Sequence, residues 1–292
     1  MREVSEPQVL IMNYKLLLIV PAILILAALG SLALQMQDGG LKRDIELKGG
    51  TQLSLEVSAD AKIAESLLKE YNARVRSATG LTGSILLIDV PIEKNATEIV
   101  PLLESKGYQI KSFSVQSVSP SLGESFFQQA QLALGIAFVL MSIAIFIIFR
   151  KPLPSLYVVM AAAFNIIEAL AFSQIIGIEL SLATFAALLL LIGYSVDTDI
   201  LLTSRVLKSG EGKVSEKIRG AMKTGLTMSG TTIAAVAALL IVTTSTVLTQ
   251  IATVLLIGLL FDIVNTWFTN AVLLRMYVEA HEKLRFSAEP KT

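Results

Sequence analysis

The sequence predicts an α-helical polytopic membrane protein, with six transmembrane helices and an external α+β domain of ferredoxin-like topology. Three observations predict this fold class: the composition, six long apolar runs, and one long polar segment between the first two runs. Of the 292 residues, 53% are hydrophobic and only 16% are charged. A soluble domain carries charge on about a quarter of its residues, so the composition favours a chain embedded in a bilayer.

Each apolar run is long enough to cross about 30 Å of hydrocarbon at about 1.5 Å per residue. The runs cover residues 14–34, 131–149, 154–176, 180–203, 226–247 and 251–277. The first run exceeds the apolar core of a signal peptide, about 7–15 residues, so we expect it to be retained. The predicted organisation is a cytoplasmic N-terminus with the first helix (1–35), an outer domain (36–125), five further helices (126–278) and a cytoplasmic tail (279–292).

Basic residues predict the orientation in the membrane. Of the 24 lysines and arginines, 14 lie in the two terminal segments and in the second and fourth links between runs, whereas the short third and fifth links have none. The positive-inside rule then places both termini in the cytoplasm of a plasma-membrane protein, with segment 36–125 outside. The net charge is zero, which gives no reason to expect nucleic-acid binding.

The outer segment has the alternation and turn signals of a folded domain. The expected order is strand 51–57, helix 61–71, strands 72–78 and 84–90 around a turn at 79–83, helix 96–106 and strand 108–118. This βαββαβ order is that of a ferredoxin-like fold. The chain has no cysteine and one histidine, His281, so we expect no metal site, no cofactor and no enzyme activity. A glycosylation sequon begins at Asn95.

Four acidic residues lie within the apolar runs, at Glu168, Asp197, Asp199 and Asp262. An ionisable side chain at a helix centre costs about 2.5–3.5 kcal/mol on insertion scales. A carboxyl group in a low-dielectric bundle can bind and release a proton, which coupling to a proton gradient requires. We therefore predict these four as proton-coupling candidates; the alternative is that they hydrogen-bond neighbouring helices as structural links.

Helical geometry limits the aspartate pair. Positions two apart point about 200° away from each other on an α-helix, so only one of Asp197 and Asp199 can face the bundle. Asp197 shares a face with Arg205, but the two lie about 12 Å apart along the axis.

Small and polar residues of the last three runs predict a polar seam between them. The residues are Ser195 and Thr198, together with Thr184, in the fourth run, Thr227, Ser229, Gly230, Thr231 and Thr232 in the fifth, and Gly258, Asp262, Asn265, Thr266, Thr269 and Asn270 in the sixth. Offsets of 4, 7, 8, 11 and 12 place most of the last set on one helix face. The seam is either a static packing surface or a path for protons or water.

Four short stretches resemble the SecF family of protein-export membrane subunits. They are Asp44-Ile-Glu-Leu-Lys-Gly-Gly-Thr51, Val118-Ser-Pro-Ser-Leu-Gly123, Gly193-Tyr-Ser-Val-Asp-Thr-Asp199 followed by Arg205, and Ser229-Gly-Thr-Thr232. The motif glycines are Gly49, Gly50, Gly193 and Gly230. The stretches occur in the family's order over nearly the whole chain.

The resemblance implies one half of a proton-driven transporter of the resistance–nodulation–division superfamily. The other six-helix half is expected from a SecD-like subunit, with the two halves related as a parallel repeat. The implied partners also include the Sec translocation channel, unfolded exported polypeptides and the lipid bilayer. Bacterial members carry Asp at the position of Thr198 and Arg at that of Thr224, so the Asp-Thr-Asp form is similar to the archaeal branch.

Three rival functions stay open at this stage. An intramembrane aspartyl protease would use Asp197 and Asp262, but the Gly-x-Gly-Asp setting of that class is absent before Asp262. A non-energised accessory or scaffold subunit of the translocon is a stronger rival. A small-molecule efflux half-transporter is the third, and the modest size of the outer segment argues against it.

Overall fold

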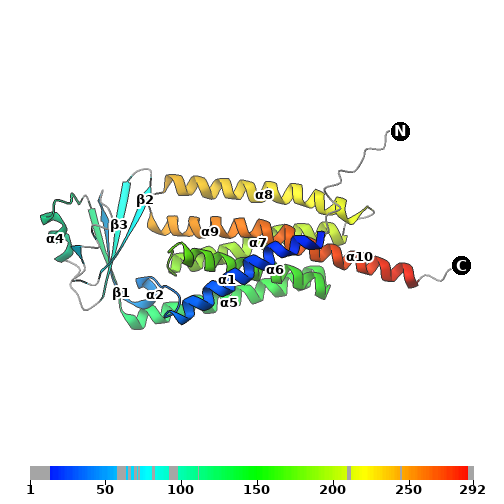
Figure 1. The fold of residues 1–292 in the computed structure, drawn as a ribbon, viewed down its shortest axis with the longest axis horizontal. Helices are drawn as coiled ribbons and strands as arrows, with labels where there is room; N and C mark the ends of the chain where they lie inside the picture. Colours follow the sequence, from blue (N-terminus) through cyan, green and yellow to red (C-terminus); the bar gives the residue numbers. More distant parts are fainter. Residues whose placement is uncertain are drawn as a thin grey trace.

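The computed structural model describes residues 14–57, 73–80, 83–91, 98–110, 112–208, 212–243 and 245–288, and residues 64, 67, 68 and 71 between the first two ranges. Figure 1 shows a long helical bundle with a small β-sheet across one end. Helix α10 and the start of the first helix lie at the opposite end of the bundle. The sheet lies at one end of the bundle, and the start of the first helix and the end of the last helix lie at the other, which is the separation that the six-helix prediction requires.

Six helices of the described chain are long and apolar enough to span a membrane, which confirms the predicted number. Their bounds are η2 (Tyr14–Leu18) with α1 (Ile19–Gln37), α5 (Pro120–Phe149), α6 (Pro152–Ile175), α7 (Leu182–Lys208), α8 (Val214–Val242), and α9 (Thr246–Val264) continuing through η5 (Asn265–Asn270) into α10 (Ala271–Ala288). Helices α5 and α8 begin 11 and 12 residues before the apolar runs that predicted them. Ser119 caps α5 by accepting a hydrogen bond from the Leu122 amide, and Pro120 occupies the first turn, as suits a helix start.

The bundle has an inner and an outer set of helices. Helices α6, α7 and α9 supply most of the buried side chains, whereas α1, α5 and α8 expose most of theirs. An apolar cluster around Leu188, Leu191 and Leu255 packs the inner helices together. Because the exposed side chains of the outer helices are themselves largely apolar, that surface suits contact with lipid.

The small domain contains a four-stranded antiparallel sheet in the order β2-β3-β1-β4. The strands are β1 (Gly50–Glu56), β2 (Arg74–Gly80), β3 (Gly83–Val90) and β4 (Ser112–Val118), with helix α2 (Ile45–Lys48) before β1 and α4 (Ile99–Ser105) before β4. Strand β3 lies between β1 and β2, which is the split βαβ arrangement expected of a ferredoxin-like fold. Most of the predicted helix 61–71, and the sequon at Asn95, lie outside the described residues.

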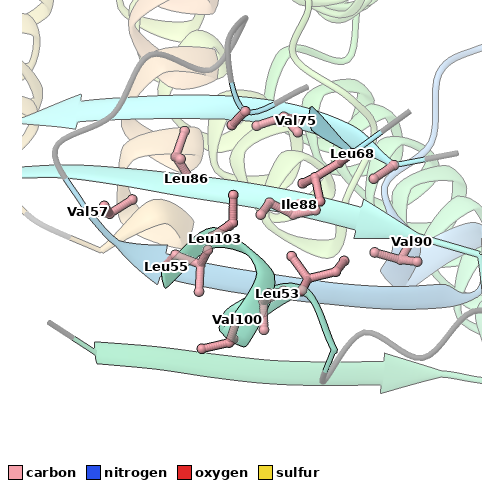
Figure 2. Packing of buried hydrophobic residues seen from close by; sticks show 13 residues of the cluster. Leu53, Leu55, Val57, Leu68, Val75, Leu86, Ile88, Val90, Val100 and Leu103 are labelled. Atoms are coloured by element: carbon pink, nitrogen blue, oxygen red, sulfur yellow. The ribbon is translucent and has the colours of Figure 1, made fainter. Parts of the chain in front are cut away.

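The sheet buries one face against α4. Figure 2 shows Leu53 and Leu55 of β1 and Ile88 of β3 facing Val100 and Leu103. The alternation on β1 predicts this burial, because successive side chains point to opposite faces. The other face carries polar side chains toward the bundle. The apolar face packed on α4 therefore stabilises the domain, and the opposite face of the sheet can form polar contacts with the transmembrane helices.

Candidate functional site

Asp262 lies at the centre of a buried polar cluster between α6, α7 and α9. Its Oδ1 accepts hydrogen bonds from Ser195 Oγ at 2.5 Å and from Asn165 Nδ2 at 3.2 Å. Its Oδ2 accepts a hydrogen bond from Thr198 Oγ1 at 3.2 Å. The side chain is only 2% exposed. A single carboxyl group thus connects three helices through side-chain donors.

Two further buried carboxyl groups each accept a hydrogen bond from an asparagine of η5. Asn265 Nδ2 donates to Glu168 Oε2, and Asn270 Nδ2 donates to Asp199 Oδ1, both at 2.7 Å. The remaining oxygens, Glu168 Oε1 and Asp199 Oδ2, have no hydrogen-bond partner among the described residues. Together with Asp262, these groups place three carboxyls inside one small bundle.

The segment η5 is a π-helix, and this explains how both asparagines reach inward. In an α-helix, Asn265 and Asn270 would point about 140° apart. A π-helix closes hydrogen bonds between residues five apart, so such residues lie nearly above one another. Both side chains are almost fully buried, one against α6 and the other against α7. Single π-helical turns occur frequently at functional sites.

The structure settles which aspartate of the fourth span faces inward. Asp199 is fully buried, whereas Asp197 is exposed on the other side of α7. Arg205 donates to Thr224 Oγ1 at 3.0 Å, and Asp197 forms no ion pair within the part of the chain that is described. Because Asp197 points away from the cluster around Asp262, these two residues do not form the dyad of an aspartyl protease.

The predicted polar seam forms only in part. Ser195, Thr198, Ser229, Asn265 and Thr269 are buried, as expected of seam residues.

The contribution of α8 to the seam is smaller than the sequence predicts. Thr227, Gly230 and Thr231 are exposed. The two threonine hydroxyls donate to carbonyls of their own helix, at Lys223 and Met228. Gly193 of α7 is exposed as well. These four residues lie on the outside of the bundle and not in its seam.

The other two motif glycines have a clear structural role. Gly49 and Gly50 adopt positive φ angles of 83° and 145°, which favour glycine. A Cβ atom on Gly49 would lie 2.7 Å from the backbone of Pro120, and one on Gly123 would lie 2.8 Å from the Gly49 nitrogen. The stretches 44–51 and 118–123 therefore pack backbone against backbone, and the start of β1 is seated on the start of α5.

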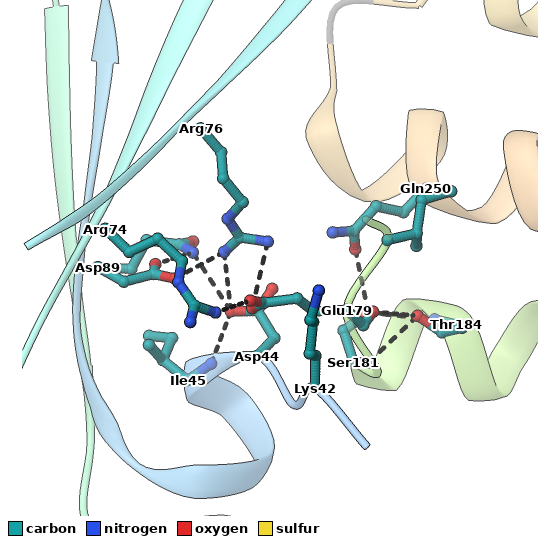
Figure 3. Close-up of polar contacts among 12 residues, drawn as sticks. Lys42, Asp44, Ile45, Arg74, Arg76, Asp89, Glu179, Ser181, Thr184 and Gln250 are labelled. Atoms are coloured by element: carbon teal, nitrogen blue, oxygen red, sulfur yellow. Dashed lines mark hydrogen bonds and ion pairs between the residues drawn. The ribbon is translucent and has the colours of Figure 1, made fainter. Parts of the chain in front are cut away.

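A network of charges connects the sheet to the loop between α6 and α7. Glu179 of this loop is buried and pairs with Arg74 at 2.5 Å and with Arg76 at 3.4 Å. Figure 3 shows both arginines pointing from the sheet toward this carboxylate. The backbone adds two hydrogen bonds, from the Asp44 amide to the Leu180 carbonyl at 2.7 Å and from the Leu180 amide to the Lys42 carbonyl at 2.8 Å.

Arg76 is the counter-charge of this junction. Its guanidinium contacts Asp89 at 2.8 Å and Asp44 at 3.4 Å, in addition to Glu179. Burial alone lowers the pKa of Arg76, but the charges of Asp89, Asp44 and Glu179 outweigh that effect and raise it. Carboxylate oxygens of Asp44, Asp89 and Glu179 lie within 4.8 Å of one another, and the Arg76 guanidinium contacts all three groups.

We predict that Arg76→Ala destabilises the protein by about 3 kcal/mol, because it leaves buried carboxylates without a cation. The measurement is the apparent melting temperature of the purified protein. Arg74→Ala is the matched control on the same strand: Arg74 is 54% exposed, so its loss is expected to cost less than about 1 kcal/mol. Equal losses for the two variants would contradict the assignment of Arg76 as the central cation.

Sequence reasoning missed Asn165, Glu179 and Arg76. A signal existed for Asn165, because it lies three residues before Glu168 and so shares its helix face. Arg74 and Arg76 likewise share one face of a strand. Their common partner, Glu179, lies more than 100 residues further along the chain, and neither periodicity nor spacing connects residues at that separation.

Known proteins share sequence with this chain over most of its length. Residues 99–280 match the family model described as protein export membrane protein SecD/SecF, C-terminal. The chain is 42% identical over 280 residues to the protein-export membrane protein SecF of Methanothermobacter thermautotrophicus, covering 91% of this chain and 93% of the relative. Identity to the SecF of Methanocaldococcus jannaschii is 36%, with 92% and 97% covered.

A solved structure has the same fold. The crystal structure of SecDF, a translocon-associated membrane protein from Thermus thermophilus, superposes with a TM-score of 0.75 at 18% identity. The match covers 96% of this chain but only 40% of the SecDF chain, so this chain spans less than half of that protein. With 42% identity over nearly its full length to one curated SecF and a family model that covers most of its helices, the chain belongs to the SecF family of protein-export membrane proteins.

Proposed function

We propose that this chain acts with a SecD-like subunit to assist Sec-dependent export of proteins across the plasma membrane. The observation that carries the proposal is the 42% identity, over 91% of the chain, to a protein-export membrane protein SecF. The six spans and the SecDF-like fold support it. In this proposal the domain at residues 36–125 is external and both termini are cytoplasmic, as the distribution of basic residues predicts.

The outer side of α7 supports a helical partner. Leu190, Gly193, Tyr194 and Asp197 follow one another at helical spacing and are all exposed. Asp197 lies about 17 Å along the helix axis from Lys208, the end of α7. A carboxylate facing lipid at such a depth is costly, so this face is expected to be covered. A second six-helix half would cover it, which is why we assign the SecD-like subunit to this side.

The buried carboxyls support coupling to the proton gradient. Glu168, Asp199 and Asp262 are all buried inside the bundle, and no basic side chain contacts them among the described residues. An ionised carboxylate buried without a cation is expensive, whereas a neutral carboxyl can both donate and accept hydrogen bonds. Movement of a proton onto or off Asp262 changes its hydrogen bonds to α6 and α7, which is how a gradient would drive a change in the packing of these helices against α9.

The edge of the sheet supports contact with exported polypeptides. Strand β4 is an edge strand with no charged residue between Ser112 and Val118. Phe113 and Val115 are 57% and 42% exposed and continue the apolar face of Leu53 and Leu55, which they oppose across the pair. An apolar, uncharged edge can accept an extended strand through its free backbone groups.

We expect Val115→Lys to reduce cross-linking of an unfolded secretory polypeptide to the outer domain several-fold, because a charge at Val115 interrupts the apolar face that would receive side chains of the added strand. The measurement is photo-cross-linking from a probe placed in that polypeptide. Ser114→Lys is the matched control, on the same edge but on the opposite face of the sheet. An equal decrease in both variants would argue against recognition of this apolar face.

Depletion of the chain in its host tests the function as a whole. Precursors of signal-bearing proteins are expected to accumulate, and the full chain supplied from a plasmid should restore their export. The SecD-like subunit is expected to co-purify with the full chain. Normal export kinetics after depletion would refute the proposed function. Impaired export that does not respond to dissipation of the proton gradient would instead identify a non-energised scaffold.

A further inference from the structure

The buried hydroxyl group of Thr203, on α7, has no hydrogen-bond partner among the described residues. The hydroxyls around Asp262 are all paired, because each donates to its carboxylate. They are those of Ser195, Thr198 and Thr266. A buried polar atom without a partner is unusual and costly in a native protein. Thr203 therefore differs from the other hydroxyls of the cluster, and something else completes its hydrogen bonding.

Two more unpaired oxygens belong to side chains beside Thr203. Asp199 precedes it by one turn on the same face of α7, and Oδ2 of this buried side chain has no partner in the part of the chain that is described. Asn270 donates to the other oxygen, Oδ1, at 2.7 Å. Its own buried Oδ1 is left without a described partner. One carboxylate oxygen, one amide oxygen and one hydroxyl are thus unpaired on neighbouring side chains.

These side chains lie toward the end of the bundle opposite the sheet. Helix α7 ends there at Lys208 (Figure 1). Thr203 lies about 6 Å beyond Asp199 along the helix axis and about 7.5 Å before Lys208. In the proposed topology this end of the bundle is cytoplasmic. Thr203 therefore lies between the buried carboxyl of Asp199 and the aqueous phase at that end.

The three unpaired oxygens suit a water molecule. A buried water typically makes about three hydrogen bonds to polar groups that are otherwise unsatisfied. The amide oxygen of Asn270 can only accept a hydrogen bond, whereas the hydroxyl of Thr203 can donate or accept one. Water can serve both, because it donates and accepts as well. A hard cation such as Ca²⁺ is less suited, since it takes about six to eight oxygen ligands.

We propose that Thr203 and Asn270 hold a water molecule against Oδ2 of Asp199, and that Asp199 exchanges protons through this water with the aqueous phase at the α10 end of the bundle. In each uptake, an O–H bond forms at Oδ2 and an O–H bond breaks at the water, which regains a proton from the solvent side. Thr203 is then a positioning residue. This inference rests on the proposed coupling to the proton gradient and names the route by which protons reach the buried carboxyls from one side.

The contacts of Asp199 connect this route to Asp262. The charges of the two carboxylates are close enough to repel one another. The hydroxyl of Thr266 donates to Asp262 at 3.5 Å and is a neighbour of Asp199 as well. Because two nearby carboxyl groups favour sharing one proton, a proton gained by Asp199 changes the charge that Asp262 can carry.

Infrared spectroscopy tests the route without any export. The full chain in lipid vesicles is moved from H₂O to D₂O over a series of pH values, and the carboxyl band of Asp199 is identified as the band that Asp199→Asn lacks. The rate at which this band shifts reports exchange of the carboxyl proton. Thr203→Val keeps the shape of the side chain but removes the hydroxyl. We expect it to slow the exchange by about tenfold, the effect on a rate of losing one hydrogen bond of about 1.4 kcal/mol.

Thr203→Ser keeps the hydroxyl and should exchange at the wild-type rate. Thr253→Val is the matched control on α9, because the Thr253 hydroxyl donates to the Thr249 carbonyl of its own helix at 2.7 Å. Its loss should leave the exchange unchanged.

A wild-type rate in Thr203→Val, or equal slowing in Thr203→Ser, would overturn the proposal. So would the absence of an Asp199 carboxyl band at every pH. A clear rise in the melting temperature of Thr203→Val would also contradict it, because a hydroxyl without any partner costs stability. No exported polypeptide and no gradient is used, so these outcomes are separate from whether the chain assists export.

Discussion

Asp262→Asn is expected to abolish the part of export that depends on the proton gradient while leaving the protein folded. Asparagine has nearly the same shape as aspartic acid and can still accept the hydrogen bond from Ser195, which is 2.5 Å away in the wild type. It cannot bind or release a proton near neutral pH. If Asp262 carries protons, the gradient-dependent rate should fall by at least about tenfold, the equivalent of about 1.4 kcal/mol in a barrier.

The measurement is the rate of precursor export in inverted vesicles, with and without an imposed gradient, together with the apparent melting temperature. Asp262→Ala should behave differently, because it removes the acceptor and leaves the donors of Ser195, Asn165 and Thr198 unpaired. Each unpaired buried donor costs about 1–3 kcal/mol, so this variant is expected to lose several kcal/mol of stability.

Ser173→Ala is the matched control for both variants. Ser173 is equally buried, but its hydroxyl donates only to the Ala169 carbonyl of its own helix. Its loss should change neither export nor stability appreciably. Full gradient-dependent export by Asp262→Asn would remove Asp262 from the proton-coupling candidates and leave it a structural link between helices.

Gly49→Ala should loosen the contact between the small domain and the start of α5. With φ 83° and ψ 154°, Gly49 occupies a backbone region that is essentially restricted to glycine, and a side chain there costs about 1–3 kcal/mol. The added Cβ would also lie 2.7 Å from the backbone of Pro120. Overpacking of this kind costs a further 1–3 kcal/mol or so. We therefore expect a loss of about 2–6 kcal/mol, visible as a lower melting temperature and as faster proteolysis between α2 and β1.

Gly39→Ala separates the cost of backbone strain from the cost of the steric clash with Pro120. Gly39 has a φ of 109°, but a Cβ there would meet nothing within 4 Å. This control variant should therefore show only the cost of backbone strain. If both variants lose the same stability, the close approach of Gly49 to Pro120 has no energetic importance.

The number and type of the helices could be predicted from the sequence because long apolar runs report directly on membrane spans. Their ends could not. Helix α8 begins at Val214, where the chain is still rich in charge, because a helix that leaves the bilayer needs no apolar side chains all round. Strand β4 begins at Ser112 and not at Tyr108, since alternation alone does not mark where pairing with β1 starts.

The sequence predicted which kinds of residue form the site, but it did not predict which residues contact one another. The cost of burying charge singled out four residues; Glu168, Asp199 and Asp262 are enclosed by the bundle, whereas Asp197 is exposed. The inward face of the sixth span was estimated with α-helical spacing throughout, which the π-helix at 265–270 alters. A local change of helix type depends on packing against neighbouring helices. The sequence pattern therefore identified the polar residues of this span without showing which carboxyl each one contacts.

The junction around Glu179 holds the small domain close to the first residues of the long helix α7. Helix α7 begins three residues after Glu179, and Asp199 lies about 26 Å further along its axis. If α7 tilts about Asp199 by some 5°, its first residue moves by about 2 Å, and the sheet that Arg74 and Arg76 hold to the loop moves with it. The coupling is reciprocal: a force that displaces the small domain would also tilt α7 and change the packing around Asp199.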